Sequence, residues 1–297
     1  MPASQARISV THFTDPGCPW AYSAAPALAV LRWRYGAQLQ WRLVTIGLTE
    51  QAEQYVRRGY TPAGQARGYQ RFRRYGMPFA PAPRARVAAT ARMCRAIHAA
   101  RLQAPGREEA VFRALQFAQF TTPLVLDEDD AVLAALRDVA GVDPAAVVAA
   151  LDDPAVTEAY EADRAAARTA AGSPTEFQGK SAQTDGPVRF TAPSLIFERA
   201  ADGARLEAGG FQPVEAYDVL LANLDGELER AAPPDGPLPA LQREPEGLTT
   251  AEVAAVLAQG NDAPDRTAAE AALIDLAAEG AARRVAVGDD AVWVAAA

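Results

Sequence analysis

Long apolar runs are absent from this sequence of 297 residues. No stretch of eighteen consecutive apolar residues occurs, so the sequence predicts no membrane-spanning helix. The first residues, Met1 to Gln5, do not combine a basic segment with an apolar one, so we expect no secretory signal. These absences favour a cytoplasmic protein without a membrane partner. The apolar fraction of 49% and the charged fraction of 22% are ordinary for a globular chain with an ample core.

Cysteine, histidine and lysine are also scarce. The two cysteines, Cys18 and Cys94, cannot build a disulfide scaffold. Cys94 and His98 would share a helix face, but no further cysteine or histidine lies near them, so we expect no metal site. Lys180 is the only lysine, and with the abundant alanine this bias is typical of a GC-rich genome. The net charge of -8 argues against general affinity for nucleic acid.

Arginine, by contrast, is concentrated in one part of the chain. Residues 54–107 contain twelve arginines and no aspartate or glutamate, while the rest of the chain is correspondingly acidic. One interpretation is an arginine-covered helical face that is solvated or paired with acidic neighbours. The other is a basic rim that attracts an anionic small molecule or an acidic protein surface. The sequence leaves both open.

A reactive cysteine is indicated in residues 15–22, which read Asp-Pro-Gly-Cys-Pro-Trp-Ala-Tyr. An alternating apolar stretch at residues 8–13 predicts a strand before this segment, and a helical pattern at residues 22–35 follows it. Cys18 would therefore lie at a helix start, with Pro19 at the first helical position. Unpaired N–H groups and the helix dipole at such a site favour the thiolate, so we expect a lowered pKa for Cys18.

The rest of the chain predicts a mixed α/β fold with a large helical region. Further strands are predicted at residues 39–46, 190–197 and 204–208, and the first two strands should form a parallel βαβ pair. The first helix should bend at Pro26. Residues 49–172 are predicted to be helical, residues 173–186 to be a loop, and residues 213–228 to be a helix.

The C-terminal part is predicted to be a separate small module. Five prolines lie between Pro233 and Pro245, so residues 231–247 should be a stiff linker. Capping boxes at Thr249–Glu252 and Thr267–Glu270 predict two helices, and residues 285–294 predict a β-hairpin. Residues 248–297 thus suggest a winged-helix-like module, but it is net acidic and we expect no DNA binding. A lid, a dimerisation element or a partner-docking module is favoured.

Together these features resemble the DsbA-like branch of the thioredoxin superfamily, particularly FrnE-like proteins. Those proteins are related to 2-hydroxychromene-2-carboxylate isomerases and kappa-class glutathione transferases. The resemblance covers roughly residues 7–230. It is carried by four stretches: Asp-Pro-Gly-Cys-Pro-Trp at 15–20, Gly-Met-Pro-Phe at 76–79, residues 114–120 with 129–133, and Ala-Pro-Ser-Leu-Ile-Phe at 192–197 with Gly-Phe-Gln-Pro at 210–213.

The resemblance implies an α/β fold class: a thioredoxin-like fold with a helical insertion (DsbA-like), plus the small α+β winged-helix-like module. Residues 1–48 and 187–230 would form the thioredoxin-like domain, and residues 49–186 the inserted helical domain. Pro193 would be the family's cis-proline beside the cysteine, and the backbone of Ala192 would pair with an extended substrate. Trp20 would shape the surface next to the sulfur.

One position departs from the family pattern. FrnE-like oxidoreductases have Cys-Pro-Trp-Cys, whereas this chain has Cys18-Pro19-Trp20-Ala21. The second thiol of such a pair resolves the mixed disulfide made by the first, and Ala21 cannot do so. The sequence does not say whether Ala21 is native or replaces a cysteine, and it does not place Cys94 near Cys18.

Three functions follow from this. The first is a monothiol oxidoreductase, in which Cys18 forms a mixed disulfide that an external low-molecular-weight thiol, glutathione or mycothiol, resolves. The second is a thiol-dependent transferase or isomerase of the kappa or chromene-carboxylate type, which needs no resolving residue. The third is a non-catalytic binding or regulatory protein. We expect no tightly bound cofactor, a substrate that carries a thiol or disulfide, and leave a homodimer open.

Overall fold

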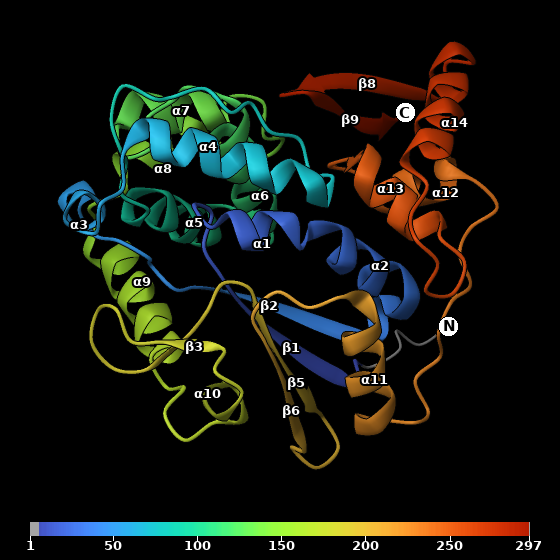
Figure 1. Ribbon diagram of the computed structural model, residues 1–297, viewed down its shortest axis with the longest axis horizontal. Helices are drawn as coiled ribbons and strands as arrows, with labels where there is room; N and C mark the ends of the chain where they lie inside the picture. The colour runs from blue at the N-terminus through green and yellow to red at the C-terminus, as the bar shows by residue number, and fades with distance from the viewer. Residues whose placement is uncertain (1–5, 297) are drawn as a thin grey trace.

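A four-stranded sheet lies at the centre of the computed structural model, which describes residues 6–296 (Figure 1). Its strands are ordered β2-β1-β5-β6. The first strand, β1 (Ile8–Thr14), pairs in parallel with β2 (Leu39–Thr45) and antiparallel with β5 (Ser194–Arg199), which pairs with β6 (Arg205–Gly209). The predicted parallel pair and the predicted hairpin of β5 and β6 are confirmed. The sheet thus joins the start of the chain to residues almost two hundred positions later.

The helix after β1 is divided in two. α1 (Pro19–Ser23) ends at Ala24, and α2 (Ala25–Tyr35) begins directly after it. Pro26 stands in the first turn of α2, where its missing N–H interrupts the ladder of hydrogen bonds from α1. The predicted bend at Pro26 is therefore a break between two helices. Gly36, with φ of 50°, ends α2.

A block of helices follows β2, and those between residues 91 and 167 share an apolar core. Its members are α3 (Ala52–Arg57), α4 (Pro62–Phe72), α5 (Ala91–Gln103), α6 (Glu108–Thr121), α7 (Asp129–Leu136), α8 (Pro144–Ala149), α9 (Pro154–Ala167) and α10 (Pro174–Phe177). The prediction of helices up to residue 172 is confirmed. The prediction of a loop at residues 173–186 is wrong in part, because it contains α10 and β3 (Ser181–Ala182), which pairs with β4 (Arg189–Phe190).

The C-terminal elements form a small module that packs against α2 (Figure 1). After α11 (Val214–Leu224) come α12 (Pro237–Arg243), β7 (Leu248–Thr249), α13 (Thr250–Leu257), α14 (Arg266–Ala278), β8 (Ala282–Val287) and β9 (Asp290–Ala295). The three strands form a sheet in the order β7-β9-β8. A small C-terminal sheet module is therefore present, and the predicted hairpin is confirmed. Its winged-helix character stays a prediction.

Two predictions for this module are corrected. The segment predicted as a linker, residues 231–247, contains α12, whose Ala240 and Leu241 are buried in one core with Trp293. The capping box at Thr249–Glu252 is confirmed, but α14 is capped by Asp265, which accepts a bond from the Ala268 N–H, rather than by Thr267. Within residues 6–296, no helix is long and apolar enough to cross a membrane. The proposed division of the chain into domains remains a prediction.

Candidate active site

Cys18 stands at the junction of the sheet and α1, as the sequence predicts. It follows a turn in which the Cys18 N–H donates to the Asp15 carbonyl at 3.1 Å and the Gly17 N–H donates to Asp15 Oδ1 at 2.8 Å. Pro19 opens α1. A Cβ at Gly17 would lie 2.5 Å from Thr90 Cγ2, so only glycine fits this turn against the start of α5.

The sulfur of Cys18 faces the residue before a cis-proline. The thiol donates to the Ala192 carbonyl over an S···O distance of 3.1 Å, and the Ala192–Pro193 peptide bond is cis. The pairing of Phe13 in β1 with Ser194 in β5 brings these segments together from opposite ends of the chain. The structure thus unites Cys18, Ala192 and Pro193, the three residues that the sequence singled out.

The electrostatic prediction for Cys18 is wrong. Burial raises the pKa of Cys18 to about 11, and the negative charge of Asp15 adds to the rise. The backbone N–H groups of Ala21 and Trp20 favour the thiolate, as does the charge of Arg189, but they do not offset desolvation. The residue is only 7% exposed, and a helix start stabilises a thiolate less than its burial disfavours it. In the free protein Cys18 is a thiol at neutral pH.

Trp20 forms one wall beside Cys18. Its ring is 40% exposed and packs on Phe72 at 4.8 Å, Tyr75 at 5.6 Å and Phe211 at 5.5 Å between ring centroids. Phe72 comes from α4, whereas Phe211 follows β6. We call these four side chains the aromatic wall. It forms an apolar surface that begins two residues from Cys18, and the role expected for Trp20 stays a prediction.

Ala21 belongs to the same apolar cluster as Cys18, whereas Tyr22 packs in another cluster with Tyr69 and Phe120. Ala21 lines a cavity of about 140 Å³ between α2, α6 and the C-terminal module. His12 also lines it, and both of its ring nitrogens lack a hydrogen-bond partner within the described residues. The Tyr22 hydroxyl donates to the Pro78 carbonyl at 2.9 Å. No sulfur stands at position 21.

A buried carboxylate ties the turn at Cys18 to the helical block, a feature that the sequence analysis missed. Asp15 Oδ2 accepts hydrogen bonds from the Leu48 N–H at 2.9 Å and from the Thr90 hydroxyl at 3.0 Å. Cys94 is fully buried, and its sulfur lies 3.6 Å from the same oxygen. Burial, with the charge of Asp15, raises the pKa of Cys94 well above its ordinary value. Cys94 therefore faces Asp15 as an unreactive thiol.

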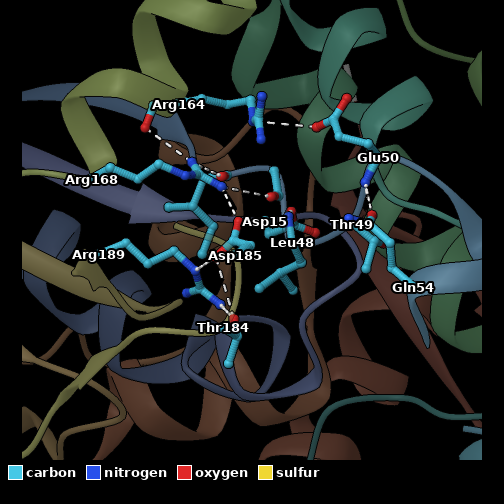
Figure 2. Close-up of polar contacts among 12 residues, drawn as sticks. Asp15, Leu48, Thr49, Glu50, Gln54, Arg164, Arg168, Thr184, Asp185 and Arg189 are labelled. Atoms are coloured by element: carbon cyan, nitrogen blue, oxygen red, sulfur yellow. Dashed lines mark hydrogen bonds and ion pairs between the residues drawn. The ribbon is translucent and has the colours of Figure 1, made fainter. Parts of the chain in front are cut away.

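A second polar network lies on the β4 side of the site (Figure 2). Asp185 accepts bonds from Arg168 and, at 3.1 Å, from Arg189. Arg189 also donates to Thr184 Oγ1 at 3.2 Å, and Arg58, directly after α3, donates to the Thr184 carbonyl at 3.1 Å. The network fixes the segment before β4 to α9 and α3. It also places a guanidinium near Cys18, although Asp185 offsets its charge.

The arginine-rich stretch of residues 54–107 contains both arginines that are paired with acidic residues and arginines that are not. Six of its twelve arginines form ion pairs with acidic residues: Arg73, Arg86, Arg92, Arg95, Arg101 and Arg107. Arg84 bonds to the Leu124 carbonyl. The remaining five have no acidic partner among residues 6–296 and are exposed: Arg57, Arg58, Arg67, Arg71 and Arg74. A basic surface on α3, α4 and the following turn therefore persists.

Comparison with known proteins finds a matching family and solved structures of similar fold. The model of the DSBA-like thioredoxin domain family matches residues 9–191. The probable DsbA oxidoreductase SCO1869 from Streptomyces coelicolor superposes with a TM-score of 0.54 at 19% identity, over 74% of this chain and 91% of that one. The cytosolic disulfide reductase DsbM from Pseudomonas aeruginosa gives 0.49 at 19% identity, over 73% and 100%. No curated protein matches the chain.

Proposed function

Since the chain belongs to the DSBA-like thioredoxin domain family, we propose that it is a thiol–disulfide oxidoreductase in which Cys18 acts as the only reactive cysteine. One observation carries the proposal: the Cys18 thiol lies 3.1 Å from the carbonyl of Ala192, next to the cis bond to Pro193. An extended substrate that pairs with this backbone would bring its sulfur beside Sγ. Ala21 supplies no second thiol, and Cys94 is buried against Asp15.

The reaction is an exchange of sulfur bonds. Cys18 loses its proton to solvent, and its thiolate attacks one sulfur of a disulfide R–S–S–R′. A bond forms between Cys18 and R–S, the R–S–S–R′ bond breaks, and R′–S⁻ leaves with the electron pair. A second, external thiolate R″–S⁻ then attacks the R–S sulfur: an R–S–S–R″ bond forms, the bond to Cys18 breaks, and Cys18 leaves as a thiolate that takes a proton from solvent. The backbone N–H groups of Trp20 and Ala21 are the donors that stabilise the Cys18 thiolate during this cycle.

The external thiol is proposed to be a low-molecular-weight one, glutathione or mycothiol, in a cytoplasmic setting. A thiol of high pKa is a poor leaving group, so a mixed disulfide at Cys18 is slow to be displaced. A small thiol reaches a 7% exposed sulfur more readily than a folded protein does. The unpaired arginines of α3 and α4 favour an anionic one.

Reduction of a disulfide substrate by glutathione tests the proposal. Wild type and Cys94→Ala should both accelerate reduction of a small peptide disulfide, whereas Cys18→Ser should leave only the uncatalysed rate. Equal rates with Cys18→Ser and wild type would refute the role of Cys18. Loss of activity in Cys94→Ala, with the fold intact, would instead make Cys94 part of the cycle.

A thiol-dependent transferase or isomerase is the second candidate, and Ala21 is the observation that favours it. Such enzymes bind a thiolate cofactor and need no resolving thiol. Ala21 supplies none. In this function Cys18 would orient the bound thiolate and would not attack a disulfide. Conjugation of glutathione to an electrophile that survives in Cys18→Ser, where a hydroxyl can still orient the thiolate, with no disulfide reduction by wild type, would favour this candidate.

A further inference from the structure

The turn between β8 and β9 carries a carboxylate that reaches from the C-terminal module to the segment beside the active site. Asp289 Oδ1 accepts a hydrogen bond from the Phe79 backbone N–H at 2.8 Å. Asp289 Oδ2 accepts one from Arg73 Nε at 2.6 Å and lies 2.5 Å from a second nitrogen of that guanidinium. One side chain thus holds both ends of residues 73–79, which we call the brace segment.

Two more contacts join the C-terminal module to the brace segment. Thr249, at the start of α13, donates its hydroxyl to Met77 Sδ at 3.5 Å. Gly288, with φ of 58°, sets the hairpin turn so close that a Cβ there would lie 3.2 Å from the Phe79 carbonyl carbon and 3.0 Å from Thr121. The turn is shaped to lie against this segment.

The brace segment carries part of the aromatic wall. Tyr75 lies within it and packs on Trp20 at 5.6 Å and on Phe211 at 5.0 Å. Phe72 immediately precedes it and packs on Trp20 at 4.8 Å. A path therefore runs from Asp289 to Arg73, along the 3-10 turn Arg73–Tyr75, and from Tyr75 to Trp20, two residues from Cys18.

The energetics favour a role for Asp289 beyond an ordinary surface ion pair. An exposed pair contributes little on its own, and Arg73 and Asp289 are 45% and 33% exposed. Here one carboxylate oxygen contacts two nitrogens of a guanidinium and the other accepts a backbone N–H, and hydrogen bonds to a charged group are the stronger ones. The residues it holds form only a short 3-10 turn, Arg73–Tyr75, and the extended stretch after it.

We propose that Asp289 is a positioning residue for the active site, and that the C-terminal module braces the aromatic wall over Cys18 instead of serving a separate binding function. The inference rests on the proposed function only for the rate effect below. The placement of Trp20 is a property of the free protein.

Asp289→Ala in the full chain, labelled with 5-fluorotryptophan, tests this by fluorine NMR. The chain has four tryptophans, and Trp20→Phe identifies the signal of Trp20. In Asp289→Ala the Trp20 signal should shift or broaden, while that of Trp293, inside the module core, should stay. Disulfide exchange at Cys18 should slow by roughly tenfold, the scale expected when a group beside the reacting atoms moves by less than ~1 Å. The rate at which iodoacetamide alkylates Cys18 should not change, because this small reagent does not need the aromatic wall for binding.

Two more variants separate positioning from damage to the module. Asp275→Ala removes the same charge from an exposed site of α14 and should change neither signal nor rate. Arg73→Ala removes the partner without touching the module and should reproduce the effect of Asp289→Ala, and the double variant should be no worse than either single one. An unchanged Trp20 fluorine signal in Asp289→Ala would overturn the inference. So would an Arg73→Ala variant in which neither this signal nor the exchange rate changes. If the proposed function were wrong, the wild-type protein would form no mixed disulfide. The Trp20 signal would still test the positioning role of Asp289.

Discussion

Cys18 in the free protein should react slowly at neutral pH and faster as the pH rises. Its pKa of about 11, raised mainly by burial from an ordinary 9.0, sets the magnitude. At pH 7 about one Cys18 in ten thousand is a thiolate, against about one in a hundred for an ordinary thiol. The more basic thiolate is intrinsically the better nucleophile, by about 6- to 10-fold over two units. The two effects leave Cys18 about 10- to 16-fold slower than an unperturbed cysteine.

Alkylation by iodoacetamide measures this rate directly. The experiment uses Cys94→Ala, so that one thiol reacts, with Cys18→Ser in the same background as the blank. The logarithm of the rate should rise by about one for each pH unit from pH 7 to pH 9, with no plateau in that range. Circular dichroism at each pH confirms that the chain stays folded. A plateau with a midpoint near pH 6 would show an activated thiolate and would refute the account of Cys18 as a desolvated thiol.

Three further predictions concern stability and resolution. His12→Leu should raise the free energy of unfolding by about 2 kcal/mol more at pH 5 than at pH 8 in urea titrations, because burial, with Arg32, lowers the pKa of His12 to about 3 and native His12 must stay neutral as the unfolded chain takes up a proton below about pH 6.5; an equal gain at both pH values would contradict it. Glu252→Ala should cost about 3–5 kcal/mol, since it strands Arg113 at 20% exposure without its 2.6 Å partner, and a loss below about 1 kcal/mol would contradict this. Ala21→Cys should shorten the lifetime of a mixed disulfide at Cys18, measured by acid quench and mass analysis, and an unchanged lifetime would mean that position 21 cannot reach the sulfur.

Much of the active site was predictable because its signals are local. An alternating strand, a turn and Pro19 place Cys18 at a helix start, and the motif around Pro193 identifies its neighbour across the sheet. The pKa of Cys18 was not predictable. Helix-start stabilisation can be read from the sequence, whereas desolvation depends on how the Ala192 strand and the Asp15 turn enclose the sulfur.

Two of the errors in secondary structure share one cause, the ambiguity of proline. The linker was predicted from its prolines, yet Pro237 lies at the start of α12 and Pro239 in the same first turn, where a missing N–H costs nothing. Ser173-Pro174 opens α10 in the same way, with the Ser173 side chain accepting from the Glu176 N–H. Proline in a first turn and proline in a linker differ only by what the following residues pack against.

The brace and the polar networks could not be seen in sequence because they join distant positions. Asp289 lies 216 residues from Arg73, and Asp15 lies 79 residues from Cys94. Only the fold brings such pairs together. The arginine-rich stretch shows the same limit, since the acidic partners of Arg86 and Arg107 come from later segments.

The central claim is that Cys18 alone exchanges with disulfides, and intact-mass analysis after incubation with oxidised glutathione tests it most directly. Wild type and Cys94→Ala should each gain the mass of a single glutathione, faster at pH 9 than at pH 7, and a reducing thiol should remove it. Cys18→Ser should gain none. An adduct that persists in Cys18→Ser, or a wild type that remains unmodified at pH 9, would contradict the account.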